Sequence, residues 1–144
     1  MRAQAIRRTA GNNPRAAIIL ASTHAVAEDR GYPAVPLLST GKNIVGETIH
    51  YPKGPAHVTA AIVTLAPGGK TIEHKHGVPL FAYILSGELT VHYRGHGART
   101  YKPGDAFMEA MDVAHYGVND GKAPVKILAV YMGAKGAKNV IPVK

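Results

Sequence analysis

From residue 33 onward the sequence is a series of short apolar stretches separated by turn-forming residues, and this pattern limits the fold more than any other feature. Glycine supplies the positive φ that tight corners need, while proline and aspartate favour particular turn types. Many short strands at this spacing are typical of a β-sandwich or a barrel, jelly rolls included. The predicted strands span residues 44–51, 58–66, 71–76, 80–86, 88–93, 98–101, 106–110, 115–118 and 125–132.

The N-terminal segment, residues 1–27, differs in character from the rest. It begins with basic residues, continues with the apolar stretch AAIILASTHAV and ends in the tripeptide AVA. This order is that of a secretory signal with an A-x-A cleavage site, and the Arg7-Arg8 pair is similar to a twin-arginine signal. An N-terminal arm packed on the body is the alternative. A cleaved signal predicts a periplasmic or secreted protein, and an uncleaved arm a cytoplasmic one.

The remainder is expected to form one domain, because a chain of 144 residues suits a single hydrophobic core. The barrel is predicted over residues 33–132. Residues 133–144 are rich in lysine and glycine, and we expect a loosely held tail there. Within that tail, residues 140–143 could instead dock as an edge strand.

The net charge of +8 does not predict a nucleic-acid partner, because four arginines in the first fifteen residues supply half of it. The rest of the chain has 13 basic and 9 acidic residues and no basic stripe interleaved with aromatic residues. The absence of cysteine excludes disulfides, thiolate metal ligands and cysteine nucleophiles. The apolar stretch near the N-terminus is too short to span a bilayer, so we expect neither nucleic acid nor membrane as a partner.

His74 and His76 stand two residues apart in a predicted strand. Side chains at positions i and i+2 of a strand face the same way, so these two imidazoles could converge on one metal ion. His115, at the start of another predicted strand, is the best candidate for a third ligand. The alternative is a pair of exposed histidines on an edge strand, because short motifs often match by chance.

The sequence around these histidines resembles the two motifs of the cupin family. The matching residues are Gly68-x5-His74-x-His76 followed by Gly87, and Gly104-x10-His115-x3-Asn119. The resemblance covers residues 58–132, with a hairpin over 88–103 between the motifs. It implies an all-β fold, the antiparallel double-stranded β-helix or jelly-roll barrel of the cupins. It also implies one divalent transition-metal ion, with iron favoured and zinc, nickel, copper or manganese as alternatives.

Carried over by position, the resemblance implies His74, His76 and His115 as metal ligands. The glutamate that usually completes the cupin site is absent. It should stand seven residues before Gly87, and that position is Leu80. The resemblance therefore implies a site of three histidines, or one completed by a different group.

Glu109 is the candidate for that group, because it lies in an otherwise apolar predicted strand. A carboxylate there is costly to bury unless it is paired, hydrogen-bonded or bound to metal. We expect Glu109 to act as a fourth ligand or as a base that orients a histidine, with a surface pair to a lysine as the alternative. Tyr116, beside His115, could touch a ligand.

The leading functional prediction is a metal-dependent enzyme acting on a small organic molecule, and the resemblance favours oxygenase chemistry, as in a dioxygenase. The inner face of residues 78–84 would give the pocket an apolar floor suited to a small, partly apolar substrate. Leu80 in place of the glutamate also fits a non-catalytic binding or sensor module, and a closed structural barrel is a third reading. The resemblance further implies a homodimer, to which residues 33–51 could contribute an exchanged strand.

Overall fold

The computed structural model describes residue 31 and residues 33–144. Its contacts divide the chain into two units, Met1–Val35 and Pro36–Lys144. The described part of the second unit contains strands but no helix. The strands are β1 (Ala56–Leu65), β2 (His74–Lys75), β3 (Leu80–Ser86), β4 (Leu89–Tyr93), β5 (Gly97–Tyr101), β6 (Ala106–Met108), β7 (His115–Val118), β8 (Val125–Ala134) and β9 (Ile141–Pro142).

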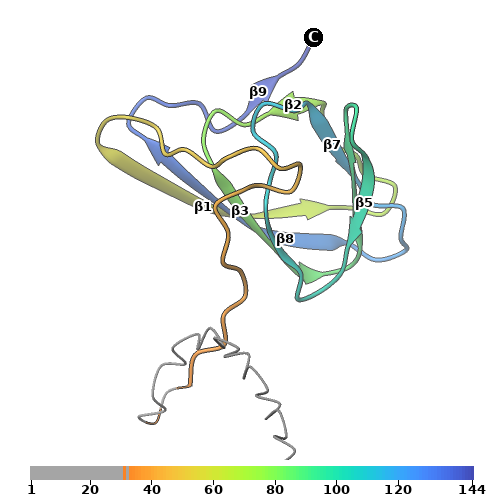
Figure 1. Ribbon diagram of the computed structural model, residues 1–144. Coiled ribbons are helices and arrows are strands. Elements are labelled where there is room, and N and C mark those ends of the chain that lie inside the picture. The colour runs from red at the N-terminus through yellow and green to blue at the C-terminus, as the bar shows by residue number, and fades with distance from the viewer. Residues whose placement is uncertain (1–30, 32) are drawn as a thin grey trace, which may run out of the picture. The chain divides into compact units, whose positions relative to one another are not determined.

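These strands form two antiparallel sheets whose inner faces pack against each other (Figure 1). One sheet has the order β1-β8-β3-β6, and the other has the order β5-β4-β7-β2-β9. The chain crosses repeatedly from one sheet to the other, as between β3 and β4 and between β6 and β7. This is the two-sheet all-β jelly roll predicted from the sequence, and that prediction is confirmed. No helix among residues 31 and 33–144 is long and apolar enough to cross a membrane.

The core forms because the apolar residues alternate along the strands. In β3, Leu80, Ala82 and Ile84 are buried while the residues between them are more exposed. A strand points successive side chains to opposite faces, so this period of two directs one apolar row inward. Ile84 is fully buried and its burial contributes about 1.5 to 3 kcal/mol. Rows from β4 and β8 meet it to make one core cluster.

Two residues of the cupin-like motifs, Gly87 and Asn119, stabilise the fold and do not contact the cavity. Gly87 turns the chain between β3 and β4 with a φ of +74°, and a methyl group there would lie 2.9 Å from Cα of Val125. Asn119 is fully buried, and its side-chain amide donates to the carbonyls of Leu65 (3.0 Å) and Ala123 (2.9 Å). It therefore ties the end of β7 to two other segments.

Most of the strands predicted from the sequence are present in the structure. The predicted boundaries of strands 80–86 and 115–118 match β3 and β7 at both ends. The predicted strand 44–51 is wrong, because this segment forms a turn at residues 44–46 and then runs irregularly, with one isolated bridge between Thr48 and Lys42. The side chain of Asn43 accepts hydrogen bonds from the amides of Val45 (3.2 Å) and Glu47 (3.0 Å). These local bonds replace a strand ladder. Residues 1–27 lie outside the described residues, so the predicted signal or arm stays a prediction.

Candidate metal centre

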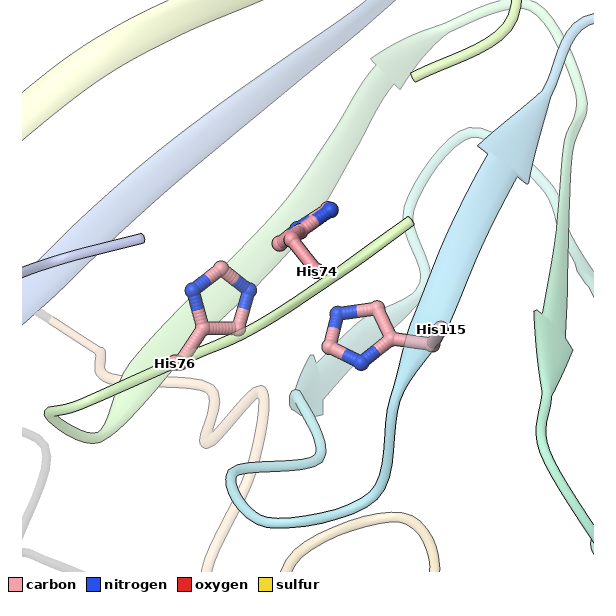
Figure 2. Close-up of side chains that lie close together, drawn as sticks. All are labelled: His74, His76 and His115. Atoms are coloured by element: carbon pink, nitrogen blue, oxygen red, sulfur yellow. The ribbon is translucent and has the colours of Figure 1, made fainter. Parts of the chain in front are cut away.

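Three histidines meet on the inner side of the second sheet. His74 lies on β2, His76 follows it directly, and His115 begins β7 opposite His74 in the antiparallel pair. Their candidate ligand atoms all lie within 4.8 Å of one another. Figure 2 shows the three rings gathered together, two from the β2 segment and one from β7. The structure therefore brings together the three residues that the sequence predicted as ligands.

Each of these imidazoles is oriented by a hydrogen bond from Nδ1 to a backbone carbonyl. The pairs are His74 with Ile72 (2.8 Å), His76 with Asn139 (2.8 Å) and His115 with Val113 (2.9 Å). A carbonyl oxygen only accepts, so Nδ1 must carry the proton in all three rings. The Nε2 lone pairs are then free to bind a metal ion, the arrangement usual for metal-binding histidines.

The donor set fits a transition-metal ion. Nε2 of His115 is buried and has no hydrogen-bond partner among the described residues. Leaving such an atom unsatisfied costs about 1 to 3 kcal/mol, and a metal ion would satisfy it. Three neutral imidazole nitrogens suit iron, zinc, copper or nickel.

The histidines are neutral at physiological pH. Burial lowers the pKa of His74 and His115, and it lowers the pKa of His76 to about 3. For His76, the neighbouring His115 and His74 lower the pKa further, while the hydrogen bond to Asn139 opposes the shift. A metal ion would therefore not have to displace protons from these rings near pH 7.

The histidines line a small cavity with mostly apolar walls. The apolar lining includes Leu80, Ala82, Leu89, Val91, Phe107, Ile127 and Ala129. The volume of the cavity is about 80 Å³, enough for a handful of waters at about 10 to 15 Å³ each. No lysine or arginine is among its described lining residues. The predicted apolar floor is thus present at Leu80 and Ala82.

Glu109 lies in the wall of this cavity and is only 6% exposed. Its Oε1 accepts a hydrogen bond from the amide of Ala110 (2.8 Å), and its carboxylate also bonds to Tyr93. Burial raises its pKa to about 7, while those bonds and His74 oppose the rise. Its carboxylate is outside the close group of histidine nitrogens. The predicted alternative of a surface pair with a lysine is wrong, because the side chain is buried.

Two tyrosines near the site, Tyr93 and Tyr131, were not among the site residues predicted from the sequence. The hydroxyl of Tyr93 lies 2.9 Å from that of Tyr101 and also bonds to Glu109. The ring of Tyr131 lines the cavity, 5.7 Å from the ring of His76. The signal was the period of two, because Tyr131 is in phase with the buried Ile127 and Ala129 of β8.

Tyr116 occupies the opposite face of β7 from His115, because successive side chains of a strand alternate. It stacks on His92 with 4.8 Å between ring centroids, and Nζ of Lys70 lies 3.6 Å above its ring. It is absent from the described lining of the cavity. The structure therefore does not bring Tyr116 to the ligand that the histidines would hold.

Comparison with known proteins agrees with this geometry. Residues 61–131 match the family model of the cupin domain. A germin-like protein of Arabidopsis thaliana, subfamily 2 member 2, is 28% identical in an alignment 106 positions long that covers 69% of this chain and 48% of that protein. The chain thus spans about half the length of this curated relative.

Solved structures with the same fold include two oxalate decarboxylases. The protein from Bacillus subtilis is 23% identical with a TM-score of 0.53, over 60% of this chain and 23% of that one. The formate complex of the Lactobacillus farciminis protein is 27% identical with a TM-score of 0.51, over 60% of this chain and 26% of that one. The motifs, the two-sheet barrel and the family match lead to one conclusion: the chain belongs to the cupin family.

Proposed function

We propose that this chain is a mononuclear-metal enzyme that acts on a small organic molecule, with dioxygenase chemistry as the favoured reaction. One observation carries the proposal: three buried, neutral imidazoles turn their free Nε2 atoms toward one another beside a small cavity. His74, His76 and His115 would hold the ion. Three protein ligands leave coordination positions open, so a bound ion could supply Lewis acidity and redox chemistry.

The walls of the cavity define the class of substrate. Its aliphatic and aromatic lining favours an apolar portion, and its volume admits only a small molecule. The described lining residues include no lysine or arginine. A negatively charged group of the substrate would therefore find no positively charged side chain in the cavity and would be stabilised only at the metal ion. We therefore propose a small, partly apolar substrate whose single polar end faces the histidines.

Glu109 is proposed as the proton acceptor and donor of the reaction. A group whose pKa is near the working pH is suited to both tasks, and burial places the pKa of Glu109 at about 7. Tyr93 and the amide of Ala110 hold the carboxyl group in the cavity wall. Glu109 would accept a proton from the bound substrate and return it to the product.

A binding or sensor module is the second candidate, and the small volume of the cavity favours it. About 80 Å³ leaves little room for a second reactant beside a bound molecule. Such a module would bind a small molecule and release it unchanged. The homodimer and the periplasmic or secreted location stay predictions, which light scattering and N-terminal sequencing of the protein from its native host would test.

The experiment is oxygen uptake by the protein reloaded with Fe²⁺, measured with a panel of small, partly apolar molecules together with oxalate and formate. An enzyme of the proposed kind consumes oxygen with at least one compound and converts it, and His115→Ala abolishes both effects. His57→Ala is the matched control, because His57 is exposed on β1 and is not among the described residues that line the cavity. A compound that raises Tm but is recovered unchanged would favour the binding module. Full turnover by His115→Ala would exclude the metal mechanism.

A further inference from the structure

The carboxy-terminal segment, residues 135–144, lies against the loop that carries two of the three histidines. It leaves β8 through a turn in which the amide of Ala137 donates to the carbonyl of Ala134 (2.9 Å). β9 then pairs with β2, with Pro142 opposite His74 (Figure 1). Because β2 has β7 on its other side, the segment covers the edge that β2 would otherwise expose.

His76 depends on this segment in a way that the other two histidines do not. His74 and His115 each bond to the carbonyl of the residue two positions earlier, within their own loops. Nδ1 of His76 instead donates to the carbonyl of Asn139, 63 residues away in the sequence. The tautomer and ring plane of His76 are therefore set by the carboxy-terminal segment.

Gly77 allows the segment to approach this closely. A methyl group on Gly77 would overlap the carbonyl oxygen of Lys138 and would lie 3.3 Å from Cδ1 of Ile141. Gly77 does not have a positive φ, so alanine would fit its backbone conformation. Substitution by alanine would thus push the segment away without straining the loop itself.

The segment is held by few contacts. Its side chains are mostly exposed, including 37% of Val140 and 40% of Ile141. Backbone hydrogen bonds such as that from the amide of Val143 to the carbonyl of Glu73 (3.0 Å) attach it to the β2 segment. Elements with little buried apolar surface open at low free-energy cost, so a ligand can shift their equilibrium.

We propose that residues 138–143 are a positioning element of the metal site, so that docking of this segment and metal binding by the three histidines strengthen each other. This inference rests on the proposed metal function. Coupling between two binding events is reciprocal. Bound metal should therefore slow the opening of the segment, and displacement of the segment should weaken metal binding. Loss of an outer hydrogen-bond partner typically costs a metal site about 10- to 100-fold in affinity.

The test is a titration of metal-free protein with Zn²⁺ and, without oxygen, with Fe²⁺, against a competing chelator. Gly77→Ala and a chain ending at Ala137 should lose about 10- to 100-fold in affinity. Gly41→Ala is the matched control, because a methyl group there meets nothing within 4 Å. Asn139→Ala should also bind normally, since it keeps the backbone carbonyl. Hydrogen exchange of the peptide 135–144 in the wild type should slow when metal is added.

The outcomes separate this inference from the proposed function. Wild-type affinity in both the Gly77→Ala and the shortened chain, with metal-independent exchange of the peptide 135–144, would overturn the inference and leave the metal site standing. A wild-type protein that binds neither ion would overturn both. If Gly77→Ala does not fold, the inference is tested by the metal affinity of the shortened chain and by the hydrogen exchange of the peptide 135–144 in the wild type.

Discussion

The amide of Glu109 donates a 2.9 Å hydrogen bond to the carbonyl oxygen of Leu80, so these two residues are neighbours across β6 and β3. Both side chains line the cavity. Leu80 stands where the cupin resemblance places a glutamate. The carboxyl group of this site therefore enters the cavity from the end of the neighbouring strand β6, beside Leu80.

Glu109→Gln should change the pH dependence of stability in the metal-free protein. Burial raises the pKa of Glu109 from 4.5 to about 7. Its contribution to stability is therefore full below about pH 4.5 and is lost as the pH rises through about 7. Glutamine stays neutral, so the free energy of unfolding of the variant relative to wild type should increase by roughly 2 to 3 kcal/mol from about pH 5 to about pH 8. Urea unfolding at several pH values measures this difference.

Glu88→Gln is the control for that series, because the side chain of Glu88 is 59% exposed. Its stability difference from wild type should not follow the same curve. A Glu109→Gln difference that stays constant with pH would mean that folding does not raise the pKa of Glu109.

Metal binding should release a proton from Glu109. The histidines are neutral already, whereas Glu109 is partly protonated near its pKa of about 7. A cation in the same cavity favours the ionised carboxylate. Calorimetric titration with Zn²⁺ near about pH 6, in buffers with different ionisation enthalpies, should show close to one proton released by wild type. Equal release by wild type and Glu109→Gln would show that the proton comes from another group.

Tyr93→Phe should destabilise the protein and raise the pKa of Glu109. Its hydroxyl lies between Tyr101 and Glu109, and its hydrogen bond lowers the pKa of that carboxyl group. Removing it should cost about 1 to 3 kcal/mol, because the buried partners lose their bonds. In the Tyr93→Phe background, the free energy of unfolding can be compared between chains with glutamate and with glutamine at position 109. The pH range over which this difference changes should extend to higher pH than in the wild-type background. Tyr83→Phe, on the more exposed face of β3, should cause no such shift.

Gly87→Ala should destabilise the barrel more than Gly95→Ala. Both glycines have a positive φ, +74° and +77°, so alanine carries a similar backbone cost of about 1 to 2 kcal/mol at each. A methyl group on Gly87 would also lie 2.9 Å from Cα of Val125, whereas at Gly95 it meets nothing within 4 Å. Thermal unfolding of the two variants measures the extra cost. Equal Tm values would mean that the β3–β4 turn moves freely away from Val125.

The sequence predicted those features that depend on local pattern. The period of two placed Leu80, Ala82 and Ile84 on the inner face, and the spacing of His74 and His76 placed both rings in one site. This holds although β2 ends at Lys75, because His76 still reaches the same cavity before the chain bends at residues 77 and 78.

Features that depend on residues far apart in the sequence could not be predicted from the local sequence pattern. The bond between His76 and Asn139 joins positions that no motif relates, so the docking of the carboxy-terminal segment was left open. Residues 44–51 carry apolar residues typical of a strand, but the side chain of Asn43 bonds their amides locally. The burial of Glu109 depends on the pairing of β6 with β3, which the local sequence pattern does not specify.

The three histidines are proposed to bind one transition-metal ion. Elemental analysis of untagged protein, purified without chelator, tests this proposal most directly for wild type, His115→Ala and Glu109→Gln. We expect close to one ion per wild-type chain, almost none in His115→Ala, and close to one in Glu109→Gln, because the proposed role of Glu109 is proton transfer and its carboxylate lies outside the group of histidine nitrogens. A wild-type protein that stays free of metal even after incubation with Fe²⁺, Zn²⁺, Ni²⁺, Cu²⁺ and Mn²⁺ would show that the three histidines do not form a metal site.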